Sequence, residues 1–297
     1  MDAVVVLSGV PQSFKDALRS KGVSVLEPFR KVFPDGEQYI RIDQKVERCL
    51  LIQSTYPNQD TKLIELYLAL EALKGMGAEI DVALLYVAYA RQDKRFLPGE
   101  PISVYALYKP LQVLGCRKLI AIDVHAPQSF ESLGLKVRNI VPHGYLAKRA
   151  GIAIDFVLAP DKGAIHRAKE LAKEFGVPYD NLEKYRDRVT GEISVKEKKL
   201  DVKGMNVAIV DDIVSTGGTL AKAVEALYSA GASKVFAVVT HALLVGSAIE
   251  KIERSGLSML ITANTVARER YPKWLVEVDV SELILKAYEG GVGSEVP

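Results

Sequence analysis

The sequence predicts an α/β protein made of two mainly parallel sheets, each flanked by helices. First, short apolar segments of strand length alternate with longer segments in which apolar residues recur at helical spacing, as in parallel strands joined by helices. Second, one eight-residue pattern occurs twice, each time before a strand. Third, 297 residues with 48% hydrophobic side chains are enough for two domains of ordinary size. We therefore expect two tandem domains of one design.

The expected strands are short runs rich in Val, Ile and Leu. They lie at residues 3–7, 50–53, 80–87, 119–124, 156–159, 207–210, 235–240 and 259–262. Helical spacing is clear after residue 219, where apolar side chains stand at Leu220, Ala223, Val224 and Leu227. Such alternation predicts parallel sheets that are covered on both faces.

The repeated pattern predicts where the domains divide. Glu71–Ala78 leads into one expected strand and Glu225–Ala232 into another, and both segments begin Glu-Ala-Leu and end Gly-Ala. Two copies of one β-α-β plan explain this repetition. We expect an N-terminal domain at residues 1–145 and a C-terminal domain at residues 146–297.

Composition limits the possible partners. The net charge of +2, from 39 basic and 37 acidic side chains, gives no reason to expect nucleic acid or an anionic membrane. No apolar run approaches the roughly 20 residues of a membrane span, and residues 1–9 lack the basic start of a signal peptide. Cys49 and Cys116 lie far apart without the spacing of a redox or zinc motif. We expect reduced thiols and a cytoplasmic protein.

The most informative segment is residues 206–220, in which an apolar strand is followed by two carboxylates, a Gly-Gly turn and a helix. Gly217 and Gly218 allow the backbone to approach an anion closely, and a helix that begins near Thr219 directs its N–H groups and positive dipole end to the same place. Asp211 and Asp212 can accept hydrogen bonds from vicinal sugar hydroxyls or meet them through a metal. The order predicts a site for a phosphorylated sugar.

The alternative is an Asp-rich turn with a helix cap. That would explain a Gly-Gly pair alone, but not the whole order of strand, acids, hydroxyls and glycines. A Walker loop is excluded, because no Lys follows the glycines. The corresponding loop of the first copy, residues 54–60, has neither the acid pair nor the glycines. Only the C-terminal domain is therefore expected to bind the sugar phosphate.

Four more polar segments lie at turns or where expected strands end, the edge at which α/β proteins bind ligands. They are residues 33–37, 89–95, 123–127 and 159–163. The structural alternatives are a hairpin turn for the first, a solvated charged face for the second and helix caps at His125 and Asp161 for the others. A single imidazole and a single carboxylate on separate loops also suit Mg²⁺, which takes few protein ligands beside waters and phosphate oxygens.

Residues 183–192 are charged and polar, with almost no apolar anchor and a Gly. This composition is typical of a polar hairpin, or of a mobile cationic loop that closes over a polyphosphate. In the second case Lys184 and Arg186 would neutralise charge that develops during transfer.

The segment 206–220 resembles the phosphoribosyl-pyrophosphate loop of the type I phosphoribosyltransferase fold. From Phe33 to about Thr265 the chain is similar to the ribose-phosphate pyrophosphokinases, whose motifs occur here in the same order. These are Phe-x-Asp-Gly-Glu at 33–37, Tyr-x-Arg-Gln-Asp at 89–93, Asp-x-His at 123–125, Pro-Asp-x-Gly at 160–163 and the loop at 211–219. The resemblance implies two tandem type I phosphoribosyltransferase-like domains, and transfer of the diphosphoryl group of ATP to ribose 5-phosphate.

The resemblance also implies roles for individual residues. ATP would be held by the first two motifs, through Phe33, Asp35, Gly36, Glu37, Arg91, Gln92 and Asp93. His125 and Asp161 would bind Mg²⁺, and Lys184 and Arg186 would be catalytic. The ligands of ribose 5-phosphate would be Arg186, Asp211, Asp212, Ser215, Thr216, Gly217, Gly218 and Thr219. The family further implies a homo-oligomer, at least a dimer, in which the adenine turn at 33–37 is supplied across a subunit interface.

Two features depart from the family pattern. Ser215 stands where many members carry Asp, and a hydroxyl cannot act as a charged base. Residues 94–101 differ from the Lys-rich stretch expected in bacterial members, which places the chain nearer the archaeal ones. Two other functions stay open: a phosphoribosyltransferase that consumes phosphoribosyl pyrophosphate, and a non-catalytic regulatory subunit. The tandem domains, the adenine turn and Arg91 with Gln92 argue against the first. The presence of Lys184, Arg186, His125 and Asp161 argues against the second.

Overall fold

The computed structural model describes residues 3–131, 133–182, 184–186, 193–195 and 200–290. The chain forms two compact units. Unit 1 extends to Ile140 and also includes Asn264–Ala267 and the segment that begins at Asp279, while unit 2 consists of Val141–Ala263 and Arg268–Val278. Among the described helices, none is long and apolar enough to cross a membrane.

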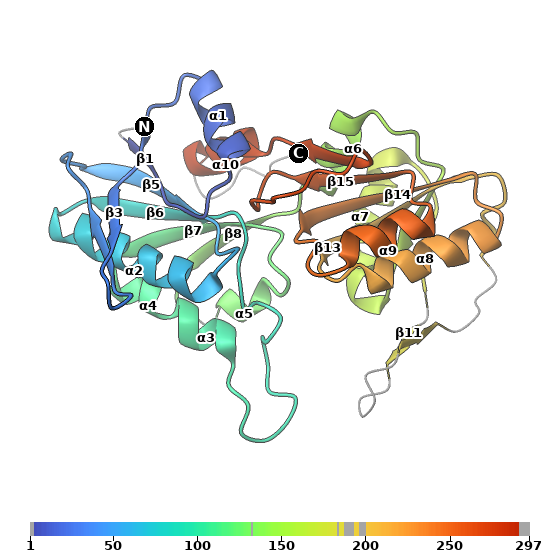
Figure 1. The fold of residues 1–297 in the computed structure, drawn as a ribbon, viewed down its shortest axis with the longest axis horizontal. Helices are drawn as coiled ribbons and strands as arrows, with labels where there is room; N and C mark the ends of the chain where they lie inside the picture. Colours follow the sequence, from blue (N-terminus) through green and yellow to red (C-terminus); the bar gives the residue numbers. More distant parts are fainter. Residues whose placement is uncertain (1–2, 132, 183, 187–192, 196–199, 291–297) are drawn as a thin grey trace. The chain divides into compact units, whose positions relative to one another are not determined.

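Unit 1 is built on a six-stranded sheet in which every neighbouring pair is parallel. In spatial order its strands are β2 (Val25–Leu26), β1 (Ala3–Val6), β5 (Arg48–Gln53), β6 (Glu79–Leu84), β7 (Cys116–Ile122) and β8 (Lys136–Ile140). Figure 1 shows α1 (Gln12–Ser20) and α10 (Ser281–Glu289) on one face, and α2 (Gln59–Gly75), α3 (Ser103–Tyr108) and α4 (Pro110–Val113) on the other. The short helix α5 (Gln128–Glu131) precedes β8.

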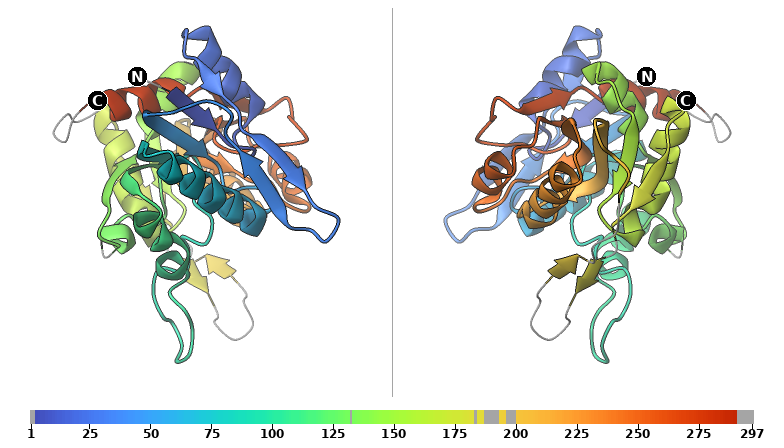
Figure 2. Two further views of the ribbon diagram at one scale, coloured as in Figure 1. Left: turned by 90° about the vertical axis from the view of Figure 1, so that its left-hand side faces the viewer. Right: turned by 90° about the vertical axis from the view of Figure 1, so that its right-hand side faces the viewer.

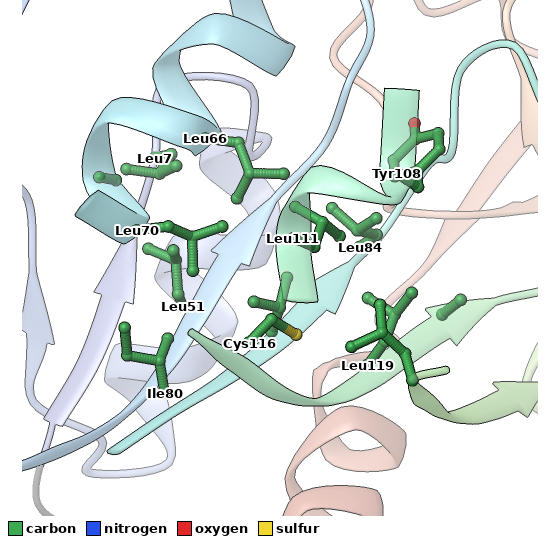
Figure 3. Packing of buried hydrophobic residues seen from close by; sticks show 14 of the residues in the cluster. Leu7, Leu51, Leu66, Leu70, Ile80, Leu84, Tyr108, Leu111, Cys116 and Leu119 are labelled. Atoms are coloured by element: carbon green, nitrogen blue, oxygen red, sulfur yellow. The ribbon is translucent and has the colours of Figure 1, made fainter. Parts of the chain in front are cut away.

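The core of unit 1 explains this arrangement. Leu51 and Ile80 from the sheet meet Leu66 and Leu70 of α2, and Tyr108 of α3 fills the next part of the layer (Figure 3). The apolar residues of α2 recur at helical spacing along one side, so burying that side against the sheet removes a continuous apolar stripe from water.

Unit 2 has a second six-stranded parallel sheet. In spatial order its strands are β10 (Tyr179–Asn181), β9 (Phe156–Ala159), β13 (Asn206–Val214), β14 (Lys234–Ala242), β15 (Met259–Ala263) and β16 (Leu275–Val278). Its helices are α6 (His143–Ala150), the 3₁₀ turn η1 (Lys162–Ala164), α7 (Ile165–Phe175), α8 (Gly218–Ser229) and α9 (Ala248–Ser255). In Figure 1, α8 and α9 lie side by side on one face and α6 and α7 lie on the other.

The two units follow one plan, which confirms the predicted fold class. Each has a two-stranded antiparallel hairpin between its second strand in the chain and the strand that leads to its long helix. In unit 1 this is β3 (Phe29–Val32) with β4 (Gln38–Arg41), and in unit 2 it is β11 (Lys184–Arg186) with β12 (Ile193–Val195). The repeated pattern lies at the equivalent places, where α2 and α8 end.

The structure divides the chain differently from the predicted boundary at 145/146. Unit 2 begins at Val141, and the end of the described chain returns to unit 1. The reason is the apolar side of α10, where Leu283, Ile284 and Ala287 are buried. These side chains pack in unit 1. The helix α10, which was expected in the C-terminal domain at 146–297, therefore belongs to unit 1.

Candidate active site

The glycine loop of unit 2 joins β13 to α8. The strand continues through both acids to Val214, four residues beyond the expected strand end. Gly217 has φ +74°, and a Cβ there would lie 3.1 Å from the carbonyl oxygen of Ala248. A Cβ on Gly218 would meet nothing within 4 Å, so open space lies beside the first residue of α8. Free helical N–H groups beside open space are what an anion requires.

The two acids of β13, Asp211 and Asp212, lie in different environments. Asp211 is half-buried and its Oδ1 accepts a hydrogen bond from the N–H of Asp212 at 2.9 Å. The Asp212 carboxylate is buried and its Oδ2 lies 3.6 Å from Nη2 of the equally buried Arg167 on α7. Burial raises the pKa of Asp211 well above its usual range, the charges of Asp212 and Asp161 raise it further, and Arg167 acts in the opposite direction. Asp211 is therefore the acid that a cation or a hydroxyl donor would stabilise most.

Two supporting residues, His143 and Arg167, were not expected from the sequence. His143 is buried at the start of α6, where its Nε2 lies 2.9 Å from the carbonyl oxygen of Asp211 and 3.2 Å from Oγ1 of Thr240. Arg167 stands on the apolar side of α7 beside Ala168 and Leu171. A cation within an apolar helical stripe indicates a buried anionic partner, and this signal could have identified Arg167.

Asp161 fulfils the capping role that was its structural alternative. Its Oδ1 accepts hydrogen bonds from the N–H groups of Gly163 at 2.9 Å and Ala164 at 3.3 Å, at the start of η1. It also contributes negative charge near Asp211. Among the described residues no group of three or more His, Cys, Asp and Glu side chains is arranged to hold a metal by protein ligands alone. Oxygen donors from few residues suit Mg²⁺, which keeps several waters and phosphate oxygens.

The predicted adenine turn forms the tip of the β3–β4 hairpin in unit 1. The N–H of Phe33 donates to the carbonyl oxygen of Glu37 at 2.8 Å, Gly36 has φ +95°, and Asp35 accepts from the N–H of Glu37 at 3.2 Å. The ring of Phe33 stays exposed, with Tyr39 edge-on at 6.1 Å. Figure 2 shows this blue hairpin extending beyond α2 of its own unit. The tip therefore presents one aromatic face and two carboxylates to a ligand.

The segment 89–93 follows β6 and turns sharply. Tyr89 has φ +61° and its hydroxyl donates to Asp60 at the start of α2. Arg91 is exposed, while Gln92 and Asp93 are half-buried. The Gln92 Oε1 accepts from the hydroxyl of Ser103 at 2.8 Å. This contact turns the amide so that its N–H₂ group is the part left to donate to a ligand.

Strained backbone marks the carboxyl edges of both sheets. In the part of the chain that the structure describes, four non-glycine residues have positive φ, and each follows a strand: Asn58, Tyr89, Asp123 and Leu244. Such conformations cost about 1–3 kcal/mol each and gather at functional sites. Asp123, buried after β7, precedes the exposed His125. His125 belongs to unit 1, whereas Asp161, its expected partner on the metal, belongs to unit 2.

Lys184 and Arg186 lie on β11. Their backbone pairs antiparallel with β12, with Lys184 opposite Val195 and Arg186 opposite Ile193. Their side chains lie outside the described part of the structure, and so do residues 187–192 of the predicted cationic loop. In the chain, the hairpin lies between the loop after β9, which carries Asp161, and the acid strand β13.

Comparison with known proteins identifies the family. Residues 4–115 match the N-terminal domain of ribose phosphate pyrophosphokinase, and residues 143–259 match the phosphoribosyl transferase domain. The ribose-phosphate pyrophosphokinase of Sulfurisphaera tokodaii is 40% identical over 95% of this chain and 99% of its own length. That of Pyrococcus furiosus is 42% identical over 80% of this chain and 85% of its own.

Among solved structures, the phosphoribosylpyrophosphate synthetase from Mycobacterium smegmatis has a TM-score of 0.86 at 27% identity. The similarity covers 98% of this chain and 100% of that one. Identity above 30% along nearly the entire chain, and a matching structure of the same extent, lead to one conclusion. This chain belongs to the ribose-phosphate pyrophosphokinase family.

Proposed function

We propose that this chain transfers the diphosphoryl group of ATP to the anomeric hydroxyl of ribose 5-phosphate, giving 5-phosphoribosyl 1-pyrophosphate and AMP for nucleotide biosynthesis. The observation that carries this proposal is the 40% identity to a ribose-phosphate pyrophosphokinase over 95% of the chain. The region of similarity includes unit 1, and a phosphoribosyltransferase that acts on a nucleobase does not need this unit. The second candidate from the sequence, a regulatory subunit, gains no support from any observation here.

Ribose 5-phosphate binds in unit 2 in this proposal. Its phosphate meets the N–H groups at the start of α8, beside Gly217 and Gly218, with hydroxyl donors from Ser215, Thr216 and Thr219. The carboxylate of Asp211 accepts hydrogen bonds from the sugar hydroxyls. Asp212 stays an expected ligand of ribose 5-phosphate, and its buried carboxylate also lies 3.6 Å from Arg167.

ATP is assigned to the residues of unit 1. Phe33 offers its exposed ring to the adenine, while Asp35 and Glu37, with Gly36 between them, accept hydrogen bonds from its amino group. Arg91 and Gln92 donate to the nucleotide, and Asp93 completes the segment. The geometry of the turn and the fixed amide of Gln92 support these roles.

The transfer builds negative charge on the oxygens around the β-phosphorus. The remaining site residues stabilise that charge, either directly or through a metal ion. Lys184 and Arg186 supply two cations from the β11–β12 hairpin, and Arg186 also reaches the sugar phosphate. We assign Mg²⁺ to His125 and Asp161, and when bound it would neutralise charge on the phosphate oxygens. The pKa of Asp211, raised by burial and by the neighbouring carboxylates, supports a cation in this region.

The chain is proposed to act in the cytoplasm as a homo-oligomer, at least a dimer. Both described cysteines are buried free thiols, as expected in a reducing compartment. The exposed aromatic and apolar side chains of the adenine hairpin support assembly: Phe29, Val32, Phe33 and Tyr39.

The test is to incubate the purified protein with ATP, Mg²⁺ and ribose 5-phosphate and to measure AMP and phosphoribosyl pyrophosphate. Both products should form in equal amounts, and omission of any one component should stop the reaction. Consumption of phosphoribosyl pyrophosphate with a nucleobase would instead indicate a phosphoribosyltransferase. A protein that binds ATP without forming AMP would support the regulatory alternative.

Lys184→Ala should lower the turnover number by several orders of magnitude, with a much smaller change in ribose 5-phosphate binding. The reason is that an ammonium acting on charge that develops in the transition state alters kcat more than affinity. Initial rates and sugar titration of the variant check this. Near-normal turnover would remove Lys184 from the mechanism.

A further inference from the structure

A buried carboxylate, Glu65, lies beside the hairpin that carries the adenine turn. It stands on α2 with its side chain 4% exposed. Oε1 accepts a hydrogen bond from the N–H of Ser8 at 3.0 Å, and Oε2 accepts from the Ser8 hydroxyl and from Nε2 of Gln53, the latter at 3.2 Å. Nη1 of Arg30, on β3, lies 3.3 Å from Oε1. The carboxylate thus joins the loop after β1, the end of β5 and the hairpin.

The internal repeat gives this position a counterpart in unit 2. Glu65 stands six residues before Glu71, and Thr219 stands six residues before Glu225, where the repeated pattern begins. Both lie on the helix that follows the equivalent strand, β5 or β13. Glu65 and Thr219 thus stand at the same distance from the repeated pattern. Because α2 begins at Gln59, Glu65 lies in the interior of its helix, whereas Thr219 is the second residue of α8. Unit 1 therefore has a buried carboxylate where unit 2 has a hydroxyl.

The charge of Glu65 is balanced by two cations. Arg30 is the first, and Lys62 is the second, because its ammonium donates to the same Ser8 hydroxyl that contacts Glu65. Burial of a carboxylate at 4% exposure requires such partners. Arg30 differs from the other partners in one respect: it belongs to the hairpin rather than to the body of the unit.

The hairpin also contacts α2 through β4. Nε2 of Gln38, on β4, donates to the carbonyl oxygen of Thr61 at 3.1 Å, and Ile40 packs against the core. All four residues of β3 are exposed. The pair of Arg30 with Glu65 is the contact that connects the exposed strand β3 to α2, and it joins two charged groups.

We infer that Glu65 is a positioning residue for the adenine turn. Held by Ser8 and Gln53, it fixes Arg30, and through Arg30 it fixes the hairpin that presents Phe33 and its neighbours. The identity of the ligand rests on the proposed function, whereas the link between helix and hairpin rests on the contacts alone. Loss of the link should weaken ATP binding without changing the site of the sugar phosphate.

The test compares Arg30→Met with Arg41→Met. Both variants replace an arginine of the same hairpin, but Arg41 pairs with Asp43 and stacks on Phe29, so its loss leaves the link to α2 intact. Arg30→Met should raise the KM for ATP about tenfold, the change expected when one hydrogen bond between charged groups is lost. The KM for ribose 5-phosphate and kcat should stay within about twofold of the wild-type values, and Arg41→Met should stay within twofold throughout.

Glu65→Gln and the double variant with Arg30→Met complete the cycle. The two single effects on the KM for ATP should be equal, and the double variant should show no further rise, because both changes remove one link. Glu65→Gln alters a buried group, so thermal unfolding is measured alongside, and Arg30→Met alone decides the question if Glu65→Gln fails to fold.

Hydrogen exchange of residues 29–41 separates this inference from the proposed function. Exchange there should be faster in Arg30→Met than in Arg41→Met, whether or not the wild-type protein makes AMP. Wild-type protein that makes no AMP would overturn the function but not the link. Unchanged exchange together with an unchanged KM for ATP, or independent effects in the cycle, would overturn the positioning role of Glu65.

Discussion

Gly217 and Gly218 are neighbours that serve different purposes. Gly217 has a positive φ and lies close to α9, so it is needed for the backbone itself. Gly218 has ordinary helical geometry and open space where a Cβ would stand. A side chain at position 218 would therefore disturb the protein only when a ligand occupies that space.

Gly218→Ala should leave the free energy of unfolding nearly unchanged and weaken ribose 5-phosphate binding by at least tenfold, because the methyl group enters the space of the phosphate. Gly217→Ala should lower the free energy of unfolding by about 1–2 kcal/mol, the cost of a left-handed conformation with a Cβ. Denaturant unfolding and calorimetric titration of the sugar phosphate separate the two effects. Unchanged sugar affinity in a stable Gly218→Ala protein would place the phosphate elsewhere.

The two aspartates of β13 should also differ on substitution. Asp211→Asn should raise the KM for ribose 5-phosphate strongly with little loss of stability, since its carboxylate is already disfavoured in the free protein. Asp212→Asn should cost about 3 kcal/mol of unfolding free energy, because it leaves the buried Arg167 without its carboxylate. Urea unfolding and sugar kinetics measured on both variants check this. If both variants changed the free energy of unfolding and the KM for ribose 5-phosphate by the same amounts, the two acids would act as one unit.

At the scale of elements, a paired acid, Asp279, lies two residues before the first residue of α10. Its Oδ2 lies 2.6 Å from Nζ of Lys21, after α1, and its Oδ1 accepts from the N–H of Ser281 at 2.9 Å. Burial acts to raise the pKa of Asp279, but the contacts with Lys21 and Ser281 outweigh it, so the pKa is lowered. The acid therefore fastens α10 to α1 in its charged form.

Because the folded-state pKa is lowered, the stability that Asp279 contributes is present above its unfolded pKa of about 4 and is lost as the pH falls through the folded value. Asp279→Asn should consequently be less stable than the wild type at pH 7, and the difference should shrink as the pH falls below about 4. Thermal unfolding across this range measures it. Asp43→Asn, at an exposed pair, is the control and should change little. A pH-independent difference would contradict the ionic role.

The central strands of both sheets could be predicted because they are apolar on both faces, as Leu50–Ile52 and Val207–Val210 show. The edge strands β2 and β16 are half-buried for most of their length, and the hairpin strand β3 is fully exposed. β2 has only two residues, and charged side chains interrupt the apolar ones at Glu277 in β16 and at Arg30 and Lys31 in β3. Pairing with a neighbour, rather than side-chain burial, forms these strands, and a single sequence does not show pairing.

The site was predictable where chemistry is local and not where it depends on packing. The acids, hydroxyls and glycines of 211–219 are consecutive, so their order alone indicated a phosphate loop. His143, Arg167 and Glu65 contact their partners over separations of 68, 45 and 35 residues. His143 and Glu65 have no sequence signal that distinguishes them from other helical residues, whereas Arg167 stands out as a cation within an apolar helical stripe. The different environments of Asp211 and Asp212 follow from those contacts, which is why the sequence assigned both acids to the sugar.

For the whole molecule, the proposed assembly has a direct test. An Asp35→Ala, Glu37→Ala variant loses the proposed adenine turn, and Lys184→Ala loses the proposed catalytic lysine, so each should be inactive alone. After dissociation and joint reassociation, some hybrid sites would combine an intact turn from one subunit with an intact hairpin from the other, and part of the activity should return. Hybrids verified by mass that stay inactive would mean that each chain builds its own complete site.

Unit 1 is made from both ends of the described chain, and this sets the order in which the protein can be completed on the ribosome. Strands β1 to β8 are synthesised first and all of unit 2 follows, but α10 emerges last. Until then Lys118 lacks the carbonyl oxygen of Ala287, its partner at 2.7 Å, and Arg48 lacks the ring of Tyr288. The part of the first sheet that α10 covers, beside α1, stays open to solvent throughout translation of the second unit. A chain that terminates before residue 279 would therefore release a finished unit 2 attached to an unfinished unit 1, so the half that is translated first is the half most exposed to chaperones and proteases.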